Sequence, residues 1–129
     1  MKKEAVICVI TIILIVALNI ITANYTKSSV SISTGQLAQL KEIISEEEID
    51  QEIAKNKIDE IHQSWDGRYN TLAFYLEHNE LEKIETELTG LRASIEVEDY
   101  EEAINELDRA VYLLKHIEEK NKLSWKNVF

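Results

Sequence analysis

The chain has 129 residues, a net charge of −10, no proline, three glycines and one cysteine. A single cysteine excludes an intrachain disulfide, and the acidic balance disfavours nucleic acid as a partner. Because residues with high helix propensity dominate and the strongest helix breaker is absent, we expect an all-α protein with room for one small domain.

The first predicted element is an uncharged apolar run of 19 residues from Ala5 to Ala23, directly after Lys2 and Lys3. A helix rises about 1.5 Å per residue, so this run measures about 28 Å, close to the hydrocarbon thickness of a bilayer. The two lysines favour a cytoplasmic N-terminus. We therefore predict that residues 1–23 form a single-pass anchor in the cell membrane, with residues 5–23 in contact with lipid and the C-terminal domain extracytoplasmic.

A cleaved signal peptide is the alternative for this segment. The apolar core is longer than the usual length of about 7 to 15 residues, and Ile21 stands where a small residue would favour cleavage after Ala23. We therefore expect the anchor to stay uncleaved.

The next segment, residues 24–36, is rich in Ser and Thr and shows no apolar helical stripe. We expect it to be a short tether between the bilayer and the domain.

Residues 37–129 form the predicted domain, an acidic helical bundle. Ser45 followed by Glu48 resembles a capping box, which predicts a chain break near Ser45 and a long first helix over residues 46–77. Asn79 and Asp99 are the next predicted N-caps, each with a Glu three residues later. Connections this short favour antiparallel neighbours, so we predict an antiparallel three-helix bundle, with a four-helix bundle as the alternative.

The long first helix would reach about 48 Å, whereas the two later helices would reach only about 26 and 33 Å. Its proximal part and the residues before it would then lack an intrachain cover. We expect this apolar face either to fold back as a fourth helix or to pair with another chain. The face consists of Leu37, Leu40, Ile43, Ile49 and Ile53.

Two glycines, Gly67 and Gly90, lie inside the helical patterns. We interpret them as positions of close helix approach or of local fraying.

A resemblance to a known family rests on the order of several features along the chain, most of them after Trp65. These are the apolar anchor, the sequence Glu77-His78-Asn79-Glu80-Leu81, the helical ladder that follows, and the closing Leu123-Ser124-Trp125-Lys126-Asn127-Val128-Phe129. Together they resemble a family of uncharacterised small membrane-anchored helical proteins of Gram-positive, often spore-forming bacteria. The resemblance implies the architecture and supplies no mechanism.

The sequence provides no set of residues that predicts catalysis, a cofactor or a metal site. His78 and Glu82 share a helix face, but two ligands are too few for a structural zinc site, and His62 and His116 merely have carboxylates nearby. The acidic runs at 46–48 and 96–102 lack the ligand spacing of a calcium-binding loop and suit predicted helix starts.

The C-terminal tail is the predicted interaction patch. Trp125, Val128 and Phe129 are apolar residues at a terminus that would ordinarily fray, and the up-down-up arrangement places them near His78 at the membrane-distal tip. They either close the end of the core or dock a partner, because aromatic clusters are enriched in binding hot spots.

The function that we expect is that of a non-enzymatic, membrane-anchored interaction module that contacts another membrane or envelope protein or a second copy of itself. The alternative is a sensor or accessory subunit that binds cations or a small ligand through its acidic surface.

Overall fold

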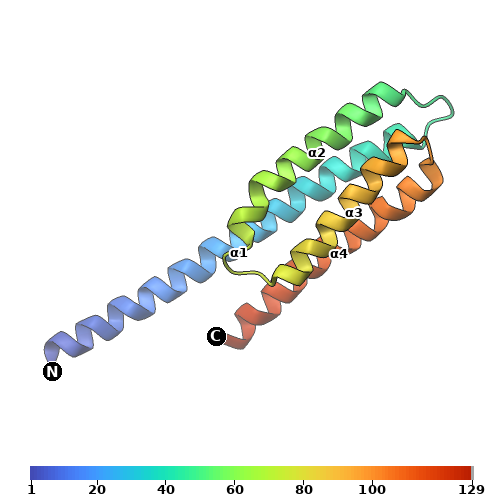
Figure 1. Ribbon diagram of the computed structural model, residues 1–129. Coiled ribbons are helices and arrows are strands. Elements are labelled where there is room, and N and C mark those ends of the chain that lie inside the picture. Colours follow the sequence, from blue (N-terminus) through green and yellow to red (C-terminus); the bar gives the residue numbers. More distant parts are fainter. Residues whose placement is uncertain (129) are drawn as a thin grey trace.

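The computed structural model describes the backbone of residues 1–128 and the side chains of residues 1–122. The described residues form four helices and no strand: α1 (Lys2–Ile44), α2 (Gln51–Leu72), α3 (His78–Glu96) and α4 (Tyr100–Val128). Each helix runs antiparallel to the one before it, and α1 extends far beyond the other three at its N-terminal end (Figure 1). The predicted all-α class is confirmed.

Helix α1 is continuous over 43 residues and joins the apolar run to the bundle. The predicted tether at residues 24–36 is therefore wrong. This segment is helical, and its inward face consists of small residues at helical spacing, which pack against the bundle although they are weakly hydrophobic. The buried residues of α1 are Thr26, Ser29, Val30, Ser33, Leu37, Leu40 and Ile44.

The chain reverses direction between α1 and α2, at residues 45–50. The break near Ser45 is confirmed, but the capping box that predicted it does not form. Asp50 is the N-cap of α2, and its Oδ1 accepts hydrogen bonds from the backbone N–H groups of Glu52 and Ile53 at 3.1 and 3.3 Å. The predicted long helix over residues 46–77 is also wrong, because α2 begins at Gln51 and ends at Leu72.

The starts of α3 and α4 agree with the sequence to different degrees. Helix α3 begins at His78, with Glu77 as N-cap and no capping side chain, so Asn79 is inside the helix and not its cap. Asp99 precedes α4 and accepts a hydrogen bond from the Glu102 N–H at 3.2 Å, as its spacing predicted. Between them, Glu98 takes a left-handed conformation (φ 59°) that allows the tight α3–α4 turn.

The four helices surround one apolar core. Helix α1 packs against α2 and α4, and α3 packs against the same two helices from the opposite side. Leu37 and Leu40 are fully buried within the chain and Ile43 and Ile49 are half-buried, whereas Ile53 is 51% exposed. The fold-back alternative is the one the structure adopts, and it makes a four-helix bundle.

Ion pairs connect neighbouring helices at the surface of the bundle. Lys41 Nζ lies 2.9 Å from Asp108 Oδ1 between α1 and α4, and Arg109 Nε lies 3.1 Å from Glu87 Oε2 between α4 and α3. Exposed pairs of this kind stabilise a fold by at most about 1 kcal/mol each, so the core carries most of the stability.

Candidate functional site

The bundle has two ends of different character. We call the end nearest to the apolar run of residues 5–23 the proximal end, and the opposite end the distal end. The α2–α3 loop and the end of α4 lie at the proximal end, while the α1–α2 and α3–α4 connections lie at the distal end (Figure 1).

The apolar part of α1 projects away from the bundle and is uncovered. None of its most apolar 18-residue window is buried in the structure, and side chains such as Ile7 and Leu14 are more than half exposed. This is one helix long and apolar enough to cross a membrane, and N-terminal signal sequences share these properties.

The proximal end is attached to α1 through Tyr75 in the α2–α3 loop. The Tyr75 hydroxyl donates to the Thr22 carbonyl oxygen at 3.1 Å and shares a hydrogen bond of 2.8 Å with Thr26 Oγ1. Burial raises the pKa of this hydroxyl above its ordinary value, which keeps it protonated as a donor. The loop is therefore fixed beside residues 22–26, where the apolar run ends.

His78 lies at this same end. Its side chain is 64% exposed, with Nε2 3.4 Å from Glu82 Oε1, and its ring meets that of Tyr69 edge to face. The end of α4 lies beside this turn, since Lys120 Nζ is 3.1 Å from Glu77 Oε2. The predicted contact of His78 with the tail residues stays a prediction. The side chains of Trp125, Val128 and Phe129 lie outside the described ones.

The predicted position of this patch at the membrane-distal tip is wrong. One more helix than predicted precedes the α2–α3 loop, and each antiparallel helix reverses the direction of the chain. The His78 turn and the end of α4 consequently lie at the end of the bundle from which the apolar run emerges (Figure 1).

The distal end is strongly acidic. Glu46, Glu47 and Glu48 are all exposed in the α1–α2 connection and do not lie at a helix start as predicted. The second acidic run, residues 96–102, forms the α3–α4 turn beside them. Gln51 joins the two connections: its Nε2 donates to the Ile95 carbonyl oxygen at 2.6 Å, and its Oε1 accepts from the Tyr100 hydroxyl.

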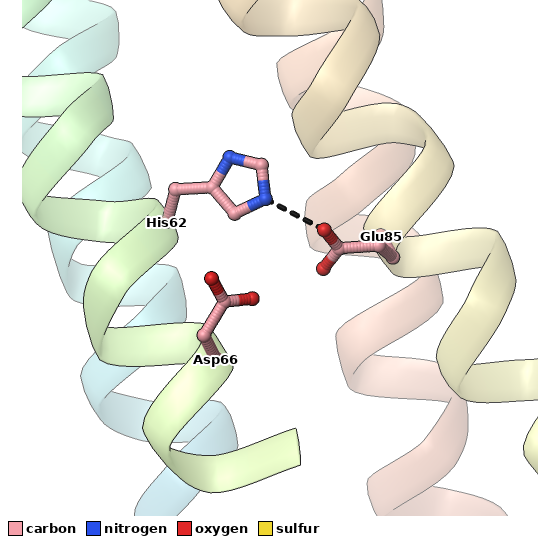
Figure 2. A group of neighbouring side chains, drawn as sticks. All are labelled: His62, Asp66 and Glu85. Atoms are coloured by element: carbon pink, nitrogen blue, oxygen red, sulfur yellow. Dashed lines mark hydrogen bonds and ion pairs between the residues drawn. The ribbon is translucent and has the colours of Figure 1, made fainter. Parts of the chain in front are cut away.

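A second candidate site lies midway along the bundle, between α2 and α3. His62 and Asp66 are one turn apart on α2 and face Glu85 of α3 (Figure 2). His62 Nε2 is 2.7 Å from Glu85 Oε1, and one ligand atom from each of the three residues lies within 4.8 Å of the others. Sequence reasoning missed this site because Glu85 is 19 residues beyond Asp66 and only the packing of α3 on α2 brings it near.

The chemistry of this trio is that of a cation site with an open position. The His62 side chain is only 12% exposed, and Glu85 Oε2 is buried without a hydrogen-bond partner. An imidazole and two carboxylates suit zinc and similar divalent ions, which take three protein ligands where a water or another ligand completes the shell. A surface pocket lined by Asp66, Tyr69, Asn70 and Glu85 gives access to it.

A wide, open surface groove lies between α3 and α4. The residues that line it include Glu82, Glu87 and Arg109, together with Tyr112 and Leu113. Arg109 is already paired, because it contacts both Glu87 and Glu102. These two carboxylates raise the pKa of its guanidinium.

Comparison with protein families places the chain. A family described as a domain of unknown function (DUF4363) matches residues 20–128. The chain belongs to this family. The match begins at residue 20, close to Thr22, whose carbonyl oxygen accepts the hydrogen bond from Tyr75, and it includes the segment that was predicted to be a tether. The searches of curated proteins and of solved structures gave no match.

Proposed function

We propose that this protein is a non-enzymatic, single-pass membrane protein that presents its acidic helical bundle outside the cytoplasm to another protein of the membrane or envelope. Part of this proposal is a Gram-positive bacterial origin, as the sequence resemblance implies. In this proposal residues 5–23 stay in the bilayer as an uncleaved anchor, and Lys2 and Lys3 hold the N-terminus in the cytoplasm.

The observation that carries the proposal is the continuity of α1. An uncovered apolar helix enters the bundle without a break, so a membrane position for the first half fixes the second half outside it. From Thr22 to Ile44 the helix rises about 33 Å, which would hold the acidic distal end at that distance from the bilayer. Exposed carboxylates at that height suit a basic partner surface.

A crosslinking experiment in membranes tests the partner. A photoreactive residue replaces Glu47 in the full-length protein, and the control protein carries it at Glu60, midway along α2; both side chains are exposed. We expect a discrete crosslinked protein from the distal position only. The proposal fails if neither position gives a product in intact membranes, or if both give the same set of products.

Charge reversal separates a specific contact from general acidity. Replacing Glu46, Glu47 and Glu48 with Lys should abolish the crosslink made from a neighbouring distal position, Glu52. The matched control reverses three exposed acidic residues on the helix sides and should retain it. The control residues are Glu60, Glu82 and Glu119.

A cation sensor is the second candidate function, and the convergence of His62, Asp66 and Glu85 favours it. Cobalt(II) titration of the full-length protein in detergent should give visible absorption from one ion per chain. His62→Ala and Glu85→Gln should each remove the signal, whereas His116→Ala, on the exposed face of α4, should not. Binding that is equal in all four proteins would exclude this site.

A further inference from the structure

We propose that the proximal end of the bundle is a lipid-contacting surface, in which the α2–α3 loop and the basic end of α4 lie in the headgroup region of the same bilayer that α1 crosses. This inference rests on the proposed membrane anchor. It commits the predicted interaction patch to lipid as its partner.

The first observation is the position of the α2–α3 loop along α1. The two hydrogen bonds of Tyr75 hold the loop against Thr22 and Thr26 of α1. The apolar run ends at Ala23 and the next charged residue is Lys27, so this is the level at which the helix leaves the hydrocarbon. The loop therefore lies at the boundary between hydrocarbon and water.

The second step is Phe74, which precedes Tyr75 in this loop. Its side chain is 89% exposed, the largest exposed fraction of any aromatic side chain among residues 1–122. Aromatic rings are enriched at membrane interfaces, where the ring leaves water and the loop backbone stays hydrated. An aromatic side chain that nothing in the bundle covers is thus placed where lipid would cover it.

The third step is the charge of the C-terminal segment. Residues 120–129 contain three lysines and no acidic residue. Lys120 contacts Glu77 and Glu80, and Lys122 contacts Glu118, so these lysines offset the carboxylates at the proximal end. Helix α4 continues past the α2–α3 loop toward the apolar end of α1 (Figure 1). Lysines at this level are typical of segments that contact anionic headgroups.

The opposite end of the bundle shows the contrast. The connections there carry the runs at 46–48 and 96–102, and anionic lipid would repel them. At the proximal end, Lys120 Nζ lies 3.1 Å from Glu77 Oε2 and 3.7 Å from Glu80 Oε1, so the negative charge there is partly offset. The distal end is therefore the more strongly acidic of the two.

Fluorescence quenching in liposomes tests this inference with the full-length protein. In a Cys8→Ser background, a single cysteine replaces Phe74, and an environment-sensitive fluorophore is attached. We expect a blue-shifted emission and strong quenching by phospholipids with a nitroxide near the headgroup. The matched control replaces Val97, an apolar residue that is 74% exposed in the α3–α4 turn, and should show neither effect.

Two further positions make the outcome decisive. A label at Leu14, within the apolar run, should be quenched by nitroxides deep in the acyl chains. A label at Lys122 should be quenched near the headgroup, and more strongly in vesicles with phosphatidylglycerol than in pure phosphatidylcholine. If Leu14 is quenched but the labels at positions 74 and 122 resemble the one at 97, the lipid-contacting surface is refuted and the anchor stands. If Leu14 is not quenched, the anchor itself is refuted.

Discussion

Gly90 of α3 and Glu106 of α4 form the closest side-chain packing against a glycine in the bundle. Glu106 is 7% exposed, and it accepts a hydrogen bond from the Ser94 hydroxyl. A Cβ atom at position 90 would lie 1.9 Å from Glu106 Oε2. The prediction of close helix approach is therefore confirmed for Gly90. Gly67 has no atom within 4 Å of its Cβ position.

These two glycines give a matched pair of substitutions. Gly90→Ala should lower the free energy of unfolding by about 1 to 2 kcal/mol, because displacing the buried Glu106 carboxyl from Ser94 outweighs the gain in helix propensity. Gly67→Ala should raise it by up to about 1 kcal/mol. Denaturant titration followed by circular dichroism measures both.

The explanation can be checked in a second background. In a Glu106→Ala protein the clash is absent, so Gly90→Ala should become stabilising there. If it stays destabilising, the carboxyl is not the cause.

Tyr75 gives a prediction that depends on pH. Tyr75→Phe removes the hydrogen bonds to Thr22 and Thr26 and should cost about 1 to 2 kcal/mol of unfolding free energy near neutral pH. Burial raises the pKa of the hydroxyl above 10.0, so the neutral form is favoured in the folded state. Its contribution is fully present below pH 10.0 and is lost as the pH rises through the raised value. The difference between the two proteins should thus be flat through neutral pH and shrink only in strong alkali.

At the scale of elements, the cap predicted from the sequence, Ser45, differs from the N-cap that the structure shows for α2, Asp50. Asp50→Ala should destabilise the protein by about 0.5 to 2 kcal/mol because the Glu52 and Ile53 N–H groups lose their acceptor. Ser45→Ala, at the cap that the sequence predicted, should change stability by much less. Equal losses from the two substitutions, measured by thermal unfolding, would contradict this assignment.

The helices were predictable from sequence wherever their inward stripe is aliphatic. The stripes of α3 and α4, with Leu81, Ile84 and Leu88 in one and Ala103 and Leu107 in the other, gave α3 and the start of α4 within a few residues. Helix α4 has 29 residues and is longer than the predicted length of about 33 Å. The second half of α1 was missed because its stripe begins with Thr26, Ser29 and Ser33. Their spacing is helical, but small hydroxylated side chains score as polar, although they permit close packing between helices.

At the scale of the molecule, the helical segment that the sequence analysis missed changed the predicted position of the site. The nearness of His78 to the end of α4 follows from antiparallel packing and was predictable. The end of the bundle at which they meet depends on whether an even or an odd number of helices precedes them, and residues 24–44 supplied the extra one. The His62, Asp66 and Glu85 trio depends on the packing of α3 on α2, which no local spacing reveals.

A closed four-helix core predicts how the whole chain behaves in membranes. Leu37, Leu40 and Ile44 are covered by the chain itself, so no second copy is needed to bury them. In a Cys8→Ser background, a cysteine at the exposed position 53 should react readily with a maleimide, yet oxidation should give no disulfide-linked dimer. A strong dimer band would show that the α1 and α2 faces also pair between chains.

Because the helix from Lys2 to Ile44 is unbroken, the bundle is joined rigidly to the apolar segment. A tether would let the bundle pivot freely, whereas a stiff rod converts any tilt of its lower half into sideways travel of its upper half. In the proposed membrane position, with about 33 Å of helix above the lipid, a change of about 10° in tilt would move the acidic tip by about 6 Å. Variation in bilayer thickness, which α1 would accommodate by leaning, would thereby reposition whatever the tip holds.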